Sequence, residues 1–194
     1  MSALENGKIR LGFAVTGSFC THRAALGVLA ELAREYETVP IVSEHAASWD
    51  TRFGTAESLG EELLGLTGRA PVTTVAEAET FGPSDPLGAL LICPCTGNTL
   101  AKLAHGITDT SVTMAAKAHL RSDRPLLIAL ATNDAMSANL SGIGTMLNRK
   151  NVFFVPMRQD DPRGKPHSLV ADFPSVPRAL RAMLEGEQLR PLFL

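Results

Sequence analysis

Short apolar segments alternate with segments of helical periodicity along almost the whole chain, and this alternation restricts the folds that the chain can adopt. The apolar segments predict buried strands over 9–15, 39–42, 70–75, 87–94, 126–131 and 151–155. Helices are predicted over 22–34, 55–66, 97–105, 111–120, 134–148 and 176–186. Strands and helices in this alternation predict an α/β protein with a Rossmann-like (flavodoxin-like) parallel sheet and helices on both faces.

The length and the even patterning of the chain predict a single domain. The sequence has 194 residues, and it contains no internal repeat, low-complexity tract or linker-like stretch, so we expect one domain over 1–194. Within it, 156–175 is rich in prolines and charged residues, which predicts an ordered loop or lid. The remaining part, 176–194, is expected to form a short C-terminal helix and a tail.

Composition argues against several classes of function. The formal net charge of −2 gives no electrostatic basis for binding nucleic acid or an anionic membrane. The N-terminal segment lacks a basic stretch followed by a long apolar run, and no run reaches about 18 apolar residues, so neither a signal peptide nor a membrane span is expected. The low, odd number of cysteines fits a reducing compartment, so we expect a cytoplasmic protein.

Ligands in sheets of this kind bind beyond the carboxyl ends of the strands, so the residues that follow each predicted strand are candidate site residues. Thr16, Gly17 and Ser18 follow the first strand, where a glycine lets a phosphate approach a helix N-terminus closely. A plain strand-to-helix turn is the alternative, and the G-x-G-x-x-G pattern of NAD sites is absent. Ser43 follows the second strand and offers a hydroxyl to a phosphate oxygen. His45 is either a general base or a solvated loop histidine.

The densest group of small polar residues follows the fourth predicted strand, in the sequence CPCTGNT at 93–99. The hydroxyl and amide groups of this tight loop can donate and accept hydrogen bonds in one plane, which suits a flat heterocycle such as a flavin. Cys93 and Cys95 suggest zinc, but zinc needs four ligands and no second cysteine pair exists, so we expect no metal. Packing in the core and a catalytic thiol are the remaining alternatives for these two cysteines.

Cations follow the last predicted strand, at Arg158, Arg163, Lys165 and His167, and a further one, Arg52, lies in the segment DTRFG. An arginine binds a carboxylate through two parallel hydrogen bonds, so cations beyond the strand ends would suit an acidic substrate. A solvated charged loop is the alternative.

The segment PCTGNTLAKLAHGITD resembles the flavin-binding signature of the flavoprotein family, which includes peptidyl-cysteine decarboxylases, phosphopantothenoylcysteine decarboxylase and flavin prenyltransferases. Those proteins have a P-A-S-A-N-T loop and then a K-x-A-x-G-x-x-D pattern, matched here by Pro94, Asn98, Thr99, Lys102, Ala104, Gly106 and Asp109. The resemblance implies FMN as cofactor. The cofactor-binding residues that it implies are Gly17, Ser18, Ser43, Pro94, Cys95, Thr96, Asn98 and Thr99.

Longer segments, among them VTGSFCT, ICPCTGNTLAKLAHGITDTSVTMAAKAHLR and QDDPRGKPHSLVADF, are similar to one branch of that family, the B subunits of dipicolinate synthases. This resemblance implies an FMN-binding oxidoreductase component that acts with an A subunit to convert a dihydrodipicolinate-type dicarboxylate to dipicolinate. Arg52, His45 and Lys165 are the candidate catalytic residues. The alternatives are an FMN-dependent decarboxylase, a flavin prenyltransferase-like enzyme, or a non-catalytic scaffold for the A subunit. Family resemblance also implies a homo-oligomer, a trimer or a multiple of it.

Overall fold

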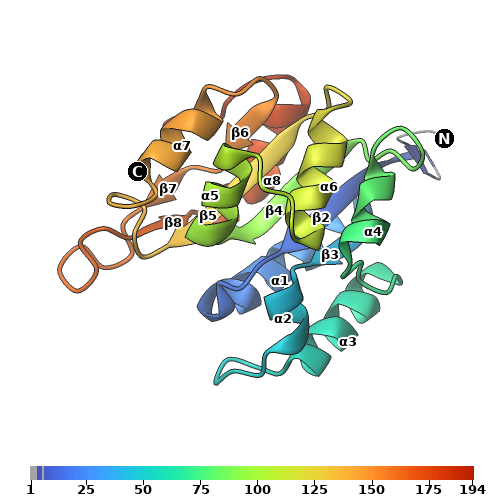
Figure 1. The fold of residues 1–194 in the computed structure, drawn as a ribbon, viewed down its shortest axis with the longest axis horizontal. Coiled ribbons are helices and arrows are strands. Elements are labelled where there is room, and N and C mark those ends of the chain that lie inside the picture. Colours follow the sequence, from blue (N-terminus) through green and yellow to red (C-terminus); the bar gives the residue numbers. More distant parts are fainter. Residues whose placement is uncertain (1–3, 6) are drawn as a thin grey trace.

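A parallel sheet forms the centre of the computed structural model, which describes residues 4, 5 and 7–194 (Figure 1). Its parallel strands pair in the order β3–β2–β4–β5–β6. Their bounds are Lys8–Val15 for β2, Glu37–Val42 for β3, Ala89–Cys95 for β4, Leu126–Thr132 for β5 and Val152–Phe154 for β6. Counted along the chain, this is the 2-1-3-4-5 order of flavodoxin-like sheets, so the predicted fold class is confirmed. The strand order reverses between β2 and β4, which is where such sheets bind ligands.

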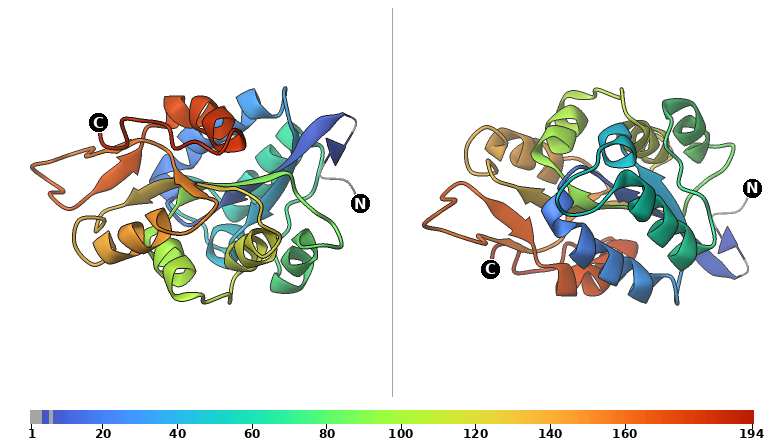
Figure 2. Two further views of the ribbon diagram at one scale, coloured as in Figure 1. Left: turned by 90° about the horizontal axis from the view of Figure 1, so that it is seen from above. Right: turned by 90° about the horizontal axis from the view of Figure 1, so that it is seen from below.

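Helices cover both faces of the sheet (Figure 2). One face carries α4 (Val75–Ala78), α5 (Gly97–His105), α6 (Ser111–Leu120) and α7 (Leu140–Leu147). The other carries α1 (His22–Leu32), α3 (Ala56–Thr67) and α8 (Val176–Leu184). The short α2 (Glu44–Ser48) and the 3-10 turns at Phe19–Thr21, Glu79–Phe81 and Phe173–Ser175 lie in the connections, and Phe81 packs into the core of the first face.

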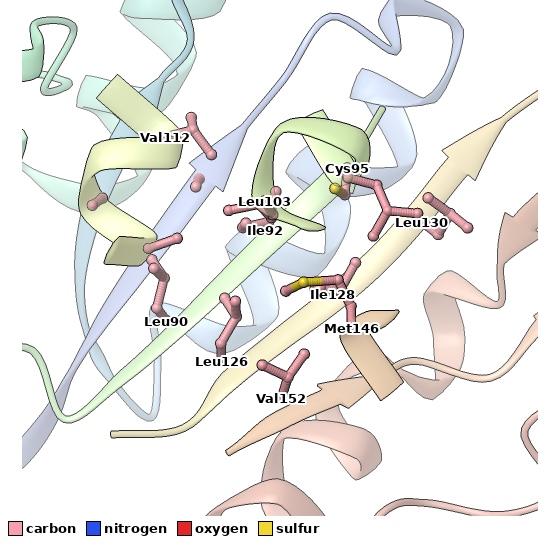
Figure 3. Packing of buried hydrophobic residues seen from close by; sticks show 14 of the residues in the cluster. Leu90, Ile92, Cys95, Leu103, Val112, Leu126, Ile128, Leu130, Met146 and Val152 are labelled. Carbon is pink, nitrogen blue, oxygen red and sulfur yellow. The ribbon is translucent and has the colours of Figure 1, made fainter. Parts of the chain in front are cut away.

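Alternate residues of each central strand belong to the two opposite cores. In β4, Leu90 and Ile92 pack under α5 and α6, whereas Leu91 and Cys93 belong to the core on the other face. Figure 3 shows the first of these cores, in which side chains of β4 and β5 meet those of α5, α6 and α7. Because both faces are buried, these strands have continuous apolar sequences without polar alternation.

Capping boxes built on threonine begin three of the helices and explain where those helices start. The side chains of Thr55, Thr74 and Thr110 each accept a hydrogen bond from the backbone N–H three residues later, in α3, α4 and α6. In each case the residue at that position returns a side-chain hydrogen bond to the threonine N–H, which completes a capping box.

The predicted strand over 70–75 is wrong. This segment makes only an isolated bridge, in which the Val42 N–H donates to the Val72 carbonyl at 2.8 Å and the Val72 N–H donates to the Pro40 carbonyl at 2.9 Å. Pro71 has no N–H for a ladder, and Thr74 already caps α4. The pairing therefore stops after one residue.

The predicted helix over 134–148 begins only at Leu140. The preceding residues form turns held by the Asp134 carboxylate, which accepts hydrogen bonds from the Thr132 hydroxyl and, at 2.8 Å, from the Asn139 amide. Polar side chains that form local hydrogen bonds in this way compete with the hydrogen bonds of a helix. The helix therefore begins only after Asn139, although the apolar periodicity starts earlier.

The segment predicted as an ordered loop or lid contains two short strands that hydrophobic patterning did not predict. These are β7 (Met157–Arg158) and β8 (Leu169–Ala171), an antiparallel pair that continues from the carboxyl end of β5 through the pairing of Ala131 with Val170. The residues between them project from the body of the protein (Figure 1). At the opposite edge, β1 (Leu4–Glu5) pairs antiparallel with β2. None of the helices in the described part of the chain is long and apolar enough to span a membrane.

A buried histidine in α6 makes the stability of this fold dependent on pH. His119 is fully buried, and its Nε2–H donates to the Pro125 carbonyl at 2.9 Å. Its Nδ1 atom has no hydrogen-bond partner among the described residues. Burial lowers the pKa of His119 from 6.5 to about 4, although the hydrogen bond to Pro125 acts in the opposite direction.

We expect the protein to lose stability as the pH falls from about 6.5 to about 4, because the unfolded chain then binds a proton at His119 that the folded chain does not. The shift corresponds to roughly 3 kcal/mol of unfolding free energy. Urea denaturation measured across this pH range should show the loss. His119→Gln keeps a hydrogen-bond donor but does not titrate, so its stability should vary less with pH. An unchanged pH dependence in this variant would contradict the assignment.

Candidate functional site

Thr16 joins β2 to β4 at the point where the strand order reverses. Its hydroxyl donates to the Pro94 carbonyl at 2.8 Å and accepts from the Thr96 N–H at 2.9 Å, while its own N–H donates to Pro94 at 3.3 Å. Thr16 is almost completely buried. The pairing of β4 with β5 shifts register between Ile92 and Cys95, so the chain leaves the regular ladder here and turns into the loop before α5.

The start of α5 is fixed by the same loop. The Thr96 hydroxyl accepts a hydrogen bond from the Thr99 N–H at 3.1 Å and donates to the Thr99 hydroxyl at 2.9 Å. Thr96 is therefore the N-cap, and α5 begins at Gly97. The first N–H groups of a helix have no partner within it, so the carboxyl end of β4 presents amide donors and a positive dipole end to a ligand.

A cavity of about 180 Å³ lies at these strand ends. It collects residues that follow three neighbouring strands, β2, β3 and β4, together with residues of α2 and α5. Its walls are formed by Gly17, Phe19, Ser43, His45, Trp49, Thr96, Asn98, Thr99, Lys102 and Thr110. The structure thus brings together most of the cofactor-binding residues that the sequence motifs implied.

Three of the implied residues lie outside this wall. Ser18 is half-buried in the turn before the first helix, whereas Pro94 and Cys95 are buried behind the loop. The Cys95 side chain points into the core under α5, as Figure 3 shows. Burial raises the pKa of both the Cys93 and the Cys95 thiols, so neither forms a reactive thiolate. The packing alternative therefore accounts for both cysteines.

Lys102 and Asp109 explain the spacing of the second part of the motif. Gly106 ends α5 in the left-handed conformation, with φ of 71°, which a residue without a side chain adopts at little cost. The turn brings Asp109 back to Lys102, and their charged groups lie 2.9 Å apart. The Lys102 ammonium lowers the pKa of the Asp109 carboxyl through this hydrogen bond. Lys102 lines the cavity from the α5 side, and its ion pair with Asp109 holds it there.

The β3 side of the cavity is held by contacts between α2 and α6. The Glu44 carboxylate accepts from the Ser111 N–H at 2.9 Å, and the Ser111 hydroxyl donates to the Val42 carbonyl at 2.7 Å. Ser43 itself is buried, and its N–H donates to the Val15 carbonyl at 3.0 Å. Among the described residues, the Ser43 hydroxyl has no hydrogen-bond partner, so it is available to a ligand in the cavity.

Gly97 is packed against the polar residues at the end of β5. A Cβ atom at this position would lie 2.5 Å from the Asn139 side-chain nitrogen, 2.6 Å from the Thr132 hydroxyl and 3.0 Å from the Asp134 carboxylate. A Cβ atom does not approach other atoms this closely, so a larger residue would have to displace these three side-chain groups, which hydrogen bonds to Asp134 hold together. The loop before α5 is thereby positioned against β5 as well as β2.

A second, larger cavity of about 360 Å³ adjoins the first and shares Phe19 and Trp49 with it. It lies among α1, α2 and α3. Its remaining walls are formed by His22, Arg23, Leu26, Ala46, Thr51, Phe53, Gly54, Thr55, Ser58, Leu59 and Glu62. Trp49 and Phe53 are about half exposed, at 54% and 53%, which leaves an apolar rim around its mouth. No sequence motif pointed to His22 or Arg23, which stand in the first turn of the helix after β2.

The three candidate catalytic residues are in different places. His45 lines the smaller cavity, and its ring packs against that of Trp49 at a tilt of 49°, with the ring centroids 4.4 Å apart. Arg52 is exposed at a turn beside the larger cavity and lies over the Phe53 ring at 4.8 Å. Lys165 is in the projecting segment and forms an ion pair with Asp160 at 3.0 Å. Neither Arg52 nor Lys165 is among the residues that line the two cavities.

The chain is a member of the flavoprotein family, whose model matches residues 2–165. Over 195 residues it is 40% identical to the dipicolinate synthase B subunit of Bacillus subtilis (strain 168), an alignment that covers 100% of this chain and 96% of that protein. The family and the branch that the sequence motifs indicated are both confirmed as relatives.

Solved structures agree with this placement. The dipicolinate synthase B subunit from Bacillus halodurans C has a TM-score of 0.88 and 36% identity, over 97% of this chain and 96% of that chain. The FMN-dependent cysteine decarboxylase SpaF has a TM-score of 0.69 and 25% identity, over 91% of this chain and 95% of that chain. The chain thus resembles the synthase component more closely than this decarboxylase.

Proposed function

We propose that this chain binds FMN beyond the carboxyl ends of β2, β3 and β4, and that it acts with a dipicolinate synthase A subunit to convert a dihydrodipicolinate-type dicarboxylate to dipicolinate. The observation that carries the proposal is the cavity at the reversal of the strand order, because residues of the flavin-binding motif line it. Similarity over the whole length to a dipicolinate synthase B subunit favours this reaction over decarboxylation.

The phosphate of FMN is assigned to the β2 and β3 side of the cavity. Gly17 leaves room for close approach, Ser18 lies in the same turn, and the free hydroxyl of Ser43 can donate a hydrogen bond. A phosphate carries negative charge, and Lys102, which lines the same cavity from α5, supplies a cation. These donors fit an anionic group better than a neutral one.

The flavin ring is assigned to the loop before α5. Thr96, Asn98 and Thr99 offer hydroxyl and amide groups on the cavity wall, which match the alternating donors and acceptors at the edge of a flavin. Pro94 and Cys95 support that loop from behind, Pro94 through its carbonyl bonds to Thr16 and Cys95 through burial in the core. Aromatic side chains at Phe19 and Trp49 supply the apolar surface that a planar ring needs.

Aromatising a dihydropyridine-type ring removes a hydride and a proton. Bound FMN supplies the hydride acceptor, and the protein supplies orientation and a base. The substrate has two carboxylates, so its site must offset two negative charges. Arg52 beside the larger cavity and Lys165 in the projecting segment are candidates for that role, provided that the segment closes over the site as a lid.

Titration with FMN tests the cofactor assignment directly. We expect saturable binding at micromolar concentration, seen as a change in flavin absorption or fluorescence. Ser43→Ala should weaken binding by about 10- to 150-fold, because a hydrogen bond to a charged group contributes on the order of 1.5–3 kcal/mol. Ser122→Ala, outside the site, is the control and should bind like the wild type. Absence of saturable binding in the wild type would contradict the proposal.

Turnover of the reconstituted A and B subunits tests the reaction. We expect dipicolinate to form only when both subunits and FMN are present. Arg52→Ala should reduce the use of the dicarboxylate by about 10- to 150-fold and leave FMN affinity nearly unchanged, since a charge-assisted hydrogen bond to a carboxylate is lost. Lys165→Ala tests the lid in the same way, and Arg34→Ala is the distant control. Full turnover without FMN would contradict the proposal and favour a non-catalytic scaffold for the A subunit. Decarboxylation of a cysteine substrate would favour the decarboxylase alternative.

We include self-association in the proposal. The exposed Trp49 and Phe53 at the mouth of the larger cavity form an apolar rim that a second copy of the chain would cover. A trimer, or a multiple of a trimer, is expected from the family resemblance. Light scattering at working concentration measures the mass, and a monomer would remove this part of the proposal.

A further inference from the structure

We propose that His22 is the general base of the proposed reaction and that the dicarboxylate binds in the larger cavity, whose wall includes this residue. The inference rests on the proposed function. His22 is not one of the residues to which the sequence motifs gave a role, and it differs from His45, which lines the smaller cavity. Three properties of His22 support this role: the orientation of its imidazole ring, its protonation state and the charges that surround it.

One ring nitrogen of His22 is fixed as a donor. Nε2 lies 2.8 Å from the Thr16 carbonyl oxygen, and a carbonyl can only accept, so Nε2 carries the hydrogen. Thr16 is itself held to the Pro94 carbonyl and the Thr96 N–H. The imidazole is therefore anchored to the same residue that positions the loop assigned to the flavin ring.

The other ring nitrogen is free to accept a proton. In a neutral imidazole with hydrogen on Nε2, the lone pair belongs to Nδ1. Among the described residues, none forms a hydrogen bond with Nδ1 of His22. The arrangement matches that of a histidine base whose second nitrogen is held by a backbone carbonyl, which fixes both the tautomer and the orientation of the ring.

The surroundings keep His22 neutral near pH 7. Burial lowers its pKa below the ordinary value of 6.5, and the hydrogen bond to Thr16 opposes this only in part. The charged groups on the same cavity wall are Arg23 from α1 and Glu62 from α3. His45 faces the adjoining cavity from α2. A neutral histidine is the form that can remove a proton.

The larger cavity suits an anionic ring. Arg23 lines it and forms neither a hydrogen bond nor an ion pair with any other described residue, so its guanidinium is available to a carboxylate. Phe19 and Trp49 belong to both cavities, so a ring bound against them lies next to the site assigned to the flavin. A volume of about 360 Å³ is at the lower end of the range for small-molecule sites.

Aromatisation of the ring removes two electrons, and oxidised flavin is the oxidant that we propose. A C–H bond of a saturated ring carbon breaks, and its proton moves to Nδ1 of His22. The electron pair of that bond becomes a new ring double bond as a hydride leaves the adjacent saturated carbon, and bound oxidised flavin would supply the acceptor for that hydride. The ring product is the aromatic dicarboxylate, and His22 ends as an imidazolium whose Nε2–H remains bonded to the Thr16 carbonyl.

His22→Gln and His22→Ala test the assignment in the reconstituted A and B subunits. Glutamine retains an N–H donor toward the Thr16 carbonyl but cannot act as a base. We expect kcat to fall by about 10²- to 10⁴-fold in both variants, which is the usual contribution of a general base. FMN affinity and the affinity for dipicolinate, measured by titration, should stay close to the wild-type values. His105→Gln, an exposed histidine of α5 that also bonds a backbone carbonyl, is the matched control and should retain activity.

The pH profile separates a base from a structural residue. In the wild type, kcat/KM should fall on the acid side with an apparent pKa below 6.5, because protonation of His22 removes the base. That acid limb should disappear from the residual activity of His22→Gln. Turnover or an acid limb like that of the wild type in His22→Gln would overturn the inference while leaving the proposed function intact. Absence of dipicolinate formation by the wild-type subunits would overturn both.

Discussion

The hydrogen bonds of Thr16 hold the carboxyl ends of β2 and β4 together, and both cavities depend on that junction. The Thr16 side chain, at the end of β2, forms hydrogen bonds with the loop before α5 and has almost no solvent access. Hydrogen bonds shielded from water in this way are electrostatically stronger than exposed ones. The carbonyl of the same residue orients His22, so the start of α1 and the start of α5 are set from a single point.

The strand ends can be positioned this accurately because the parallel sheet is buried on both faces. The continuous apolar sequences of β4 and β5 pack against helices on both faces of the sheet. This packing fixes the positions of the strand ends independently of the loops that follow them. Polar groups are confined to the edge where the strands stop. Gly97 shows how closely this edge is packed, because an added methyl group there would collide with the side chains at the end of β5.

The parts of the structure that follow from apolar periodicity could be predicted from the sequence, and those that follow from polar side chains could not. The long strands and α5, α6 and α8 lie where hydrophobic patterning placed them. By contrast, Thr74 and Asp134 decide where α4 and α7 begin, and their hydrogen bonds depend on partners that only the folded chain brings close. Residues at the strand ends, such as Gly17 and Ser43, could be expected to converge because neighbouring parallel strands end at one edge. His22 gave no such signal, because its importance comes from a carbonyl six residues earlier and from a cavity built by three helices.

The burial of two of the three cysteines determines how this protein would respond to oxidants. Reoxidation of a reduced flavin by molecular oxygen produces hydrogen peroxide, which attacks thiolates and leaves thiols largely untouched. Cys93 and Cys95 are closed off by the core on both sides of β4 and stay protonated. Among the three cysteines, oxidation would therefore fall on Cys20, which is exposed in the turn before α1, two residues from His22. An oxidised Cys20 would lie two residues from His22 in the sequence, while β4, the strand that supports the site, would keep its two thiols reduced.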